Sequence, residues 1–378
     1  MKLPLLCWTA GALAGGALWS QEFIPQQPPP AMRLEPLPAK VIDPRGNPAT
    51  PAKVTLGRLL FFDPILSADG TVACATCHDP RFGWADGRTT PLGMGGAGKG
   101  PERLPVRSLN LPPLVRNTPT VLNAGFLGLV AGAPLAPEAA PLFWDGREHG
   151  LEAQVAHPLN AAAEMGGPLP AQNALEAAAE RLRSVPAYET LFQAAFGVGG
   201  ASITGQRLAQ ALAAFERSLR AGNTAVDRFF GGDPKALSAL SRQGLEVFQS
   251  AGCAHCHGGP MFSDFQRHVV GFPDGERAAM RTPSLRNLIS TAPYMHNGAL
   301  RSLEDVLAFY DQLQDTVSET LDGGDDAAQP PLDPLLRRLH LRTEDIPSLL
   351  AFLRDLQSPD YDRSIPSAVP SGLDVGGK

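Results

Sequence analysis

The chain has 378 residues, of which 39 are glycine and 37 are proline, and its formal net charge is −6 at pH 7. This mild negative charge argues against nucleic acid as a partner, because nucleic-acid-binding domains carry clustered positive charge. The length suggests two domains of ordinary size, and the glycine and proline content indicates a loop-rich fold.

The first forty residues are predicted to lie outside the folded core. Residues 1–20 outline a signal peptide, because Met1 and Lys2 precede the short apolar run LPLLCWTAGALAGGAL and polar residues follow from Ser20. The run is too short to span a bilayer comfortably, but no clear A-x-A cleavage site follows it, so an uncleaved membrane anchor is the alternative. Residues 21–40 are rich in proline and glutamine and are predicted to form a tether.

Helical periodicity divides the rest of the chain into two predicted domains, residues 41–221 and residues 235–365. The predicted helices lie at 54–66, 171–184 and 204–221 in the first domain, and at 236–250, 303–313 and 343–356 in the second. Residues 79 to about 140 are predicted to be a Gly/Pro-rich loop, and residues 366–378 a disordered tail. No alternating strand pattern persists, so the predicted fold is mainly α.

Two CxxCH pentapeptides use four of the five cysteines. Two thiols spaced by two residues can add to the vinyl groups of one haem, and the adjacent histidine can coordinate its iron. The alternatives are a disulfide within either pair and a zinc site built from both pairs, although zinc needs no histidine after each pair. The residues are Cys74, Cys77 and His78 in the first motif, and Cys253, Cys256 and His257 in the second. The sequence therefore predicts two cytochrome-c-like domains, each with one covalently bound c-type haem.

Two haems in one chain can divide a two-electron reaction between them. One open iron then carries out the chemistry, and one fully ligated iron acts as the electron relay. This division predicts an acid–base group over one iron and a sixth ligand over the other. Because haem c is attached outside the cytoplasm in bacteria, the motifs and the predicted signal peptide together indicate the periplasm.

Six stretches of the sequence resemble the bacterial dihaem cytochrome c peroxidase family, which includes the MauG-type enzymes. The resemblance runs from about Leu56 to Leu356 in the family's order. The stretches are LGRLLFFDPILSADGTVACATCH, NTPTVLN, FWDGREHGLEAQ, PLNAAAEMG, CAHCHGGPMFSD and RTPSLRNLISTAPYMHNG. The resemblance implies an enzyme that reduces hydrogen peroxide to water. Its electrons come from a small cytochrome c or copper protein and pass from the C-terminal electron-transfer haem to the N-terminal peroxidatic haem.

The resemblance also implies residues for proton and electron transfer. In this family a glutamate, with a glutamine ten residues before it, handles the peroxide protons, and Glu164 and Gln154 match this pair. Trp144 matches an aromatic residue that lies between the two haems. Without the resemblance, Glu164 would be interpreted as a solvated loop acid and Trp144 as a core aromatic residue.

The sixth ligand of the C-terminal iron is predicted to be Tyr310, which matches the family's ligand position fourteen residues after His296. A tyrosine there resembles the MauG-type arrangement, and a phenolate favours ferric and higher oxidation states. Tyr310 also falls on an apolar helical stripe, so a core position is one alternative. Met280, Met295 and His268 are alternative ligands.

The iron at His78 is predicted to be five-coordinate or water-ligated. Classical family members hold a removable histidine over this iron, but residues 79–148 contain no histidine. His149 and His157 come later, where the family's ligand does not lie, and they are predicted to be surface or supporting residues.

A calcium ion between the domains is implied by Asn117, Thr291 and Pro293, which match the family's ligands, the latter two through backbone carbonyls. Neutral oxygens and waters suit such a hard cation. Homodimers are common in the family, so a second copy of the chain is another candidate partner.

Two other functions remain at this point. A MauG-like enzyme would use high-valent iron to oxidise a partner protein, and Tyr310 and the missing distal histidine favour this alternative. A non-enzymatic dihaem electron carrier is the third hypothesis, and Glu164 and Gln154 argue against it.

Overall fold

The computed structural model describes residues 31–378 except 107, 169–171, 198–202 and 324–328. It confirms the mainly α, loop-rich fold. The helices are α1 (Pro51–Phe62), α2 (Cys74–Cys77), α3 (Leu151–Gln154), α4 (Ala156–Asn160), α5 (Ala174–Arg183), α6 (Pro186–Phe196), α7 (Gly205–Ser218), α8 (Ala225–Phe230), α9 (Ala239–Ser250), α10 (Leu303–Gly323) and α11 (Ile346–Arg354). Short antiparallel pairs join β1 (Gly96–Ala97) to β2 (Leu104–Pro105), β3 (Pro141–Leu142) to β4 (Glu148–His149), and β5 (Arg267–Val269) to β6 (Ala279–Arg281).

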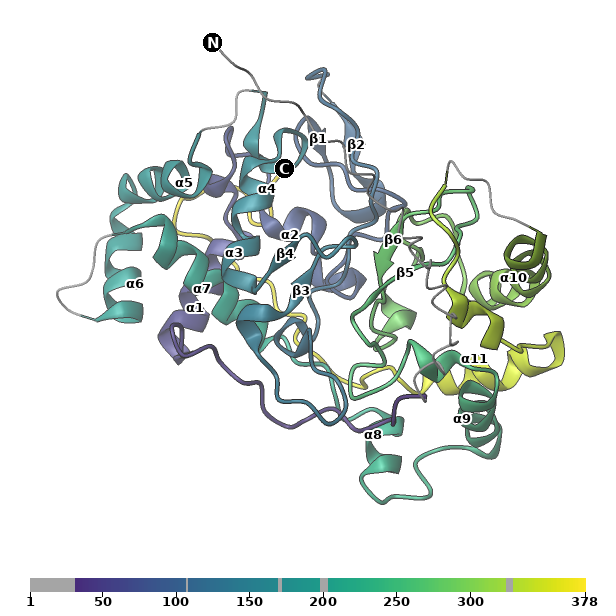
Figure 1. Cartoon of the computed structure of the whole chain (residues 1–378). Coiled ribbons are helices and arrows are strands. Elements are labelled where there is room, and N and C mark those ends of the chain that lie inside the picture. Colours follow the sequence, from purple (N-terminus) through teal and green to yellow (C-terminus); the bar gives the residue numbers. More distant parts are fainter. Residues whose placement is uncertain (1–30, 107, 169–171, 198–202, 324–328) are drawn as a thin grey trace, which may run out of the picture.

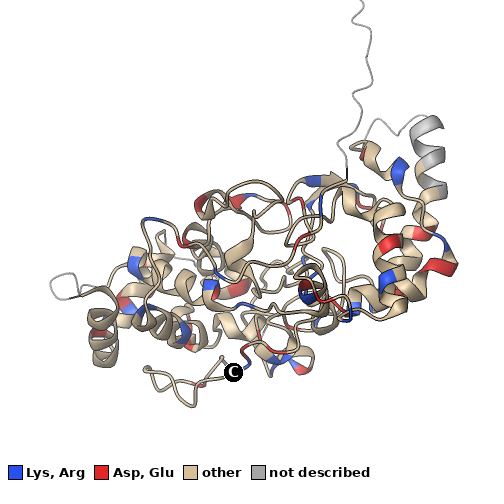
Figure 2. Cartoon of the chain, turned by 90° about the horizontal axis from the view of Figure 1, so that it is seen from below, with Lys and Arg blue, Asp and Glu red and all other residues tan. Residues whose placement is uncertain are grey.

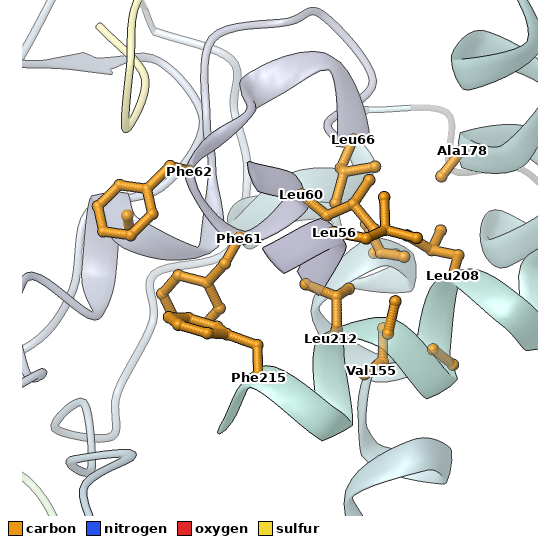
Figure 3. Close-up of a cluster of buried hydrophobic side chains, with 14 of the residues drawn as sticks. Leu56, Leu60, Phe61, Phe62, Leu66, Val155, Ala178, Leu208, Leu212 and Phe215 are labelled. Atoms are coloured by element: carbon orange, nitrogen blue, oxygen red, sulfur yellow. The ribbon is translucent and has the colours of Figure 1, made fainter. Parts of the chain in front are cut away.

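Helices α1 and α7 form the centre of the N-terminal half. Helix α1 starts where the Thr50 side chain accepts a hydrogen bond from the Lys53 amide, and it ends just before Pro64. The two helices approach closely at Gly57, where a Cβ atom would lie 2.0 Å from the Ala211 carbonyl oxygen. Apolar side chains from both helices fill the core around this contact (Figure 3).

Helices α9 and α11 repeat this arrangement in the C-terminal half. A Cβ atom at Gly244 would lie 1.9 Å from the Ser348 carbonyl oxygen, so glycine again permits the close approach. Each half then adds a packed aromatic trio beside its helix pair. Phe61, Trp84 and Phe215 form the first trio, and Phe248, Phe262 and Phe352 form the second.

Two asparagines join the halves at one carbonyl. Asn123 and Asn287 both donate from Nδ2 to the oxygen of Ala221, at 2.9 and 3.5 Å. Their side-chain oxygens accept hydrogen bonds from the amides of Ala221 and Ser358, both at 2.8 Å. The backbone amides of the two asparagines also donate to the residues that follow α7 and α11, namely Leu219 and Leu356. The chain therefore contains an internal structural repeat, in which the two halves have equivalent loops.

The two ends of the described chain each cross to the opposite half (Figure 1). The prediction of a tether at 21–40 is wrong for the described part, residues 31–40, because Leu34 is buried in the C-terminal core and the Leu37 amide donates to Asp227 at 2.8 Å. The prediction of a disordered tail at 366–378 is also wrong. Ser371 donates to Asp63 at 2.6 Å, and the Gly376 carbonyl accepts a hydrogen bond from Thr76 at 2.8 Å.

The helices differ from the predictions mainly at their ends. Helix α10 continues well beyond residue 313, and the helix predicted at 343–356 is a 3₁₀ turn (Thr343–Asp345) followed by α11. Helix α6 was not predicted, and the predicted boundary at 221–234 contains α8. Within the described ranges no helix is long and apolar enough to cross a membrane. The predicted signal peptide and Cys7 lie outside the described residues.

Candidate active site

The first CxxCH motif forms α2 and ends at a buried imidazole. The Nδ1 atom of His78 lies 3.2 Å from the Trp84 carbonyl oxygen, so Nδ1 carries the proton and Nε2 keeps a free lone pair. Burial lowers the pKa of His78 to about 4, which keeps the ring neutral. A neutral imidazole with an oriented Nε2 is the form that coordinates a haem iron.

The second motif repeats this geometry. Cys253–His255 form a 3₁₀ turn (η7), and the Nδ1 atom of His257 lies 3.1 Å from the Phe262 carbonyl oxygen. Trp84 and Phe262 both have positive φ, 61° and 53°, which turns each carbonyl back toward its histidine. The structure therefore gives both predicted iron ligands the same orienting hydrogen bond.

A cavity beside the second motif fits a haem. Cys253, Cys256 and His257 line it, together with the Tyr310 ring. Most of its other lining residues are apolar, and they come from residues 117–127, from residues 261–296, from α10 and from the segment around the 3₁₀ turn η9 (Pro334–Arg338). A large apolar cavity with two thiols and one oriented imidazole on its wall suits a porphyrin attached through its vinyl groups.

The cysteines do not support the zinc or disulfide alternatives. All four described cysteines are free thiols, and burial raises the pKa of Cys74 and of Cys253 to about 12. Across the described residues, no cluster of potential metal ligands joins cysteines of the two motifs.

Glu164 lies on a π-helical turn (Ala162–Gly166) that the segments flanking the first motif hold in place. The Met94 amide donates to the Ala163 carbonyl at 3.0 Å, and the Ala68 amide donates to the Met165 carbonyl at 2.9 Å. Burial raises the pKa of the Glu164 carboxyl. Burial also raises the pKa of the Cys77 thiol, with smaller contributions from the charges of Asp86 and Glu164. A carboxyl group beside the first motif, with a raised pKa, is a candidate acid–base catalyst.

Gln154 is the last residue of α3, and only α4 separates this helix from the Glu164 turn. The following segments pack on each other in the order α3, α4 and the π-helical turn. The structure thus places Gln154 and Glu164 on one local unit of the N-terminal half.

Tyr310 lies on α10 and lines the cavity of the second motif. Burial raises the pKa of its hydroxyl group. Among the alternative ligands, His268 is already engaged at both ring nitrogens, by Asp333 at 2.6 Å and by Asp264 at 2.8 Å. Met280 and Met295 line the cavity too. In this structure both ring nitrogens of His268 are thus occupied by carboxylates, whereas Tyr310, Met280 and Met295 remain candidate ligands.

Trp144 lies at the junction of the two halves. Its Nε1 donates to the Asn117 carbonyl at 2.8 Å, and its own carbonyl accepts a hydrogen bond from the Arg281 amide at 2.6 Å. In the internal repeat, Asn117 and Arg281 are equivalent, because each precedes a Thr-Pro pair: Thr118-Pro119 and Thr282-Pro283. The indole also lines the C-terminal cavity, so both the structural and the electron-transfer interpretations of Trp144 are compatible with its position.

The predicted calcium ligands Asn117, Thr291 and Pro293 all line this cavity. The Asn117 side chain donates from Nδ2 to the Arg88 carbonyl at 2.8 Å, which leaves Oδ1 for another partner. Within the described part of the chain, the clusters of histidine, cysteine and acidic ligands do not include these residues, so a calcium ion there would depend on neutral oxygens.

His149 and His157 lie between the FWDGR stretch and the Glu164 turn. His149 is exposed on β4, and Nε2 of His157 lies 2.7 Å from a Glu148 carboxylate oxygen. Both are surface or supporting residues, as predicted. The sequence analysis did not identify Arg281, Asp86 or the paired asparagines as functional or structural candidates. The repeated Thr-Pro segments are the sequence signal that could have drawn attention to them.

Comparisons with known proteins agree with this geometry. A model of the di-haem cytochrome c peroxidase family matches residues 51–235. The chain is 35% identical over 345 residues to the methylamine utilization protein MauG of Methylorubrum extorquens. This alignment covers 87% of this chain and 85% of that relative. It is 31% identical to the cytochrome c551 peroxidase of Pseudomonas aeruginosa, over 74% of this chain and 78% of that relative.

Solved structures show the same architecture. A MauG-like protein associated with microbial copper homeostasis superposes with a TM-score of 0.68 at 27% identity, over 85% of this chain and 95% of that chain. The diheme peroxidase BthA from Burkholderia thailandensis shares the fold, with a TM-score of 0.56 at 21% identity over 91% of this chain and 95% of that one.

Proposed function

Because the chain belongs to the dihaem cytochrome c peroxidase family, which makes it an oxidoreductase acting on peroxide, we propose that it reduces hydrogen peroxide to two waters with two electrons and two protons. The family implies two haem groups, and in this proposal each is a covalently bound haem c. Cys74, Cys77 and His78 hold the peroxidatic haem, and Cys253, Cys256 and His257 hold the electron-transfer haem. When bound, the haems supply the redox-active irons.

The position of Glu164 is the observation that carries this proposal. Its turn is hydrogen-bonded to the segments on both sides of the first motif, and burial raises the pKa of its carboxyl. The ionised carboxylate accepts the proton of the near peroxide oxygen, and the resulting acid returns it to the leaving oxygen, which departs as water. The Gln154 amide orients the peroxide beside this carboxyl.

Electrons enter through the C-terminal half in this proposal. The donor is a small periplasmic cytochrome c or copper protein, and Trp144 connects the relay haem to the peroxidatic haem. Figure 2 shows lysines and arginines interspersed with acidic residues in both halves, with no long run of one sign along the ribbon. A second copy of the chain is a further candidate partner, and a calcium ion near Asn117, Thr291 and Pro293 would stabilise the junction.

A second function is favoured by one observation. Tyr310 lies in the cavity of the second motif, where a phenolate ligand would favour oxidised iron. Two relatives with 35% identity are named methylamine utilization protein MauG. A MauG-like oxidation of a partner protein is therefore the alternative, whereas Glu164 beside the first motif argues against a simple electron carrier.

Replacing Glu164 by Gln tests the proposed function. The amide cannot shuttle the proton, so we expect steady-state peroxide reduction with a reduced cytochrome to fall by a factor of roughly 10². Glu180→Gln, an exposed ion-pair residue on α5 of the same half, is the matched control and should keep full activity. Equal turnover in the wild type and Glu164→Gln would contradict the role of Glu164.

A further inference from the structure

Arg281 differs from two other buried arginines of the described structure, Arg217 and Arg286. Arg217 and Arg286 each form an ion pair with a carboxylate, with Glu152 at 2.6 Å and with Asp227 at 2.8 Å. Arg103 donates only to main-chain oxygens, one of them on the last residue, Lys378. Arg281 is 7% exposed, and in the described ranges no acidic side chain pairs with it. A buried guanidinium without a counter-charge is costly.

The electrostatics of the cavity also show that Arg281 has no counter-charge. Burial alone lowers the pKa of Arg281 to about 10, and no neighbouring carboxylate opposes the shift. Asp333, an acidic residue of the cavity wall, is engaged by His268, and the charge of Arg286, the other arginine there, is balanced by Asp227. Arg281 is therefore a cavity-lining arginine whose charge no carboxylate among the described residues balances.

The contacts of Arg281 fix where its charge lies. Nε donates to the Phe143 carbonyl at 3.0 Å, Nη1 makes a long contact of 3.4 Å with the Thr282 carbonyl, and the backbone amide donates to the Trp144 carbonyl. These contacts leave Nη2 for another acceptor. Arg281 also lines the same cavity as His257 and Trp144.

We propose that Arg281 is a positioning residue that binds a propionate of the C-terminal haem and ties that propionate to the Trp144 segment. This inference rests on the proposed haem at His257. A propionate supplies the missing negative charge, and a guanidinium binds carboxylates through charge-assisted hydrogen bonds. Through Nε and its backbone amide, the same residue holds Phe143 and Trp144 in register with the haem edge.

The test uses the full-length holoprotein with Arg281→Gln and Arg281→Lys. Glutamine removes the charge, so we expect the midpoint potential of the C-terminal haem alone to fall and its propionate bending band in resonance Raman spectra to shift. Losing the Nε contact that holds the segment of Phe143 and Trp144 should also slow electron transfer between the haems by a factor of about ten, although the lower potential of the donor haem increases the driving force. Lysine keeps the charge but not the planar fork, so the potential should stay near wild type while transfer slows.

Arg267→Gln is the matched control, because Arg267 lies opposite Arg281 in the β5–β6 pair but is exposed. It should leave potentials, Raman bands and transfer rate unchanged. The inference would be overturned if Arg281→Gln left the potential of the C-terminal haem and its propionate band unchanged. It would also be overturned if the potentials of both haems shifted equally. Haem content separates the two proposals: fewer than two haems per wild-type chain contradicts the proposed function, whereas two haems without these shifts contradict only the role of Arg281.

Discussion

The two halves of the molecule share one frame and differ in the groups added to it. Both pack a helix pair at a glycine, orient a CxxCH histidine with a backbone carbonyl, and connect through an asparagine to Ala221. The N-terminal half adds a carboxyl group, Glu164, on its own π-helical turn, whereas the C-terminal half adds Tyr310 and Arg281. A duplicated frame thus fixes the iron ligands, and the connecting segments determine what each site does.

Removing one pair of cysteines should separate the reaction with peroxide at one haem from the electron relay at the other. In Cys253→Ala/Cys256→Ala, loss of the covalent relay haem should abolish peroxide turnover with a protein donor, while the N-terminal haem still reacts with peroxide in stopped-flow absorbance measurements. In Cys74→Ala/Cys77→Ala, the donor should still reduce the C-terminal haem, but no reaction with peroxide should be seen. Donor-dependent turnover in either double variant would contradict the division of roles. Each variant should retain one haem in a pyridine haemochrome assay.

A smaller effect concerns two acidic residues at equivalent positions, Asp86 and Asp264, each two residues after the carbonyl that orients its histidine. Burial raises the pKa of Asp86 to about 6, and one of its oxygens has no hydrogen-bond partner. The pKa of Asp264 is lowered, because its bonds to His268 and other donors outweigh its burial. The two carboxyl groups should therefore affect stability with opposite signs.

Asp86 favours folding when protonated, so its contribution is fully present below pH 4 and is lost as the pH rises through about 6. Asp264 favours folding when ionised, so its contribution is present above pH 4 and is lost at lower pH. At pH 7 we expect Asp86→Asn to raise the melting temperature and Asp264→Asn to lower it, with free-energy changes on the order of 1–3 kcal/mol. Thermal unfolding of the holoprotein at pH 4 and pH 7 measures both, and shifts of the same sign at pH 7 would show that the two positions are not electrostatically distinct.

The sequence was informative where the signal is local. In each CxxCH motif the spacing alone identifies the cysteines and the histidine, and the structure places each histidine in a suitable tautomer. Glu164 and Trp144 carry no local signal and could be predicted only through the order of the family's stretches. Helix α6 had ordinary start and stop signals, Pro186 and Gly197, but its apolar periodicity is weak.

Features that depend on distant backbone contacts could not be predicted. The segment 366–378 has no periodicity, and it is ordered because its backbone bonds to Phe62 and Thr71 in the N-terminal half. Residues 31–40 show only two leucines, whose burial depends on grooves of the opposite half. Arg281 begins one of the family's stretches, but its proposed role follows from the absence of an acidic neighbour among the described residues, which the sequence does not show.

The inequality of the two irons is the central claim, and an EPR spectrum of the ferric holoprotein tests it most directly. We predict one high-spin signal from a five-coordinate or water-ligated iron at His78, and one low-spin signal of His/Tyr type from the iron at His257. Two low-spin haems, or a low-spin signal of His/Met type, would contradict this account.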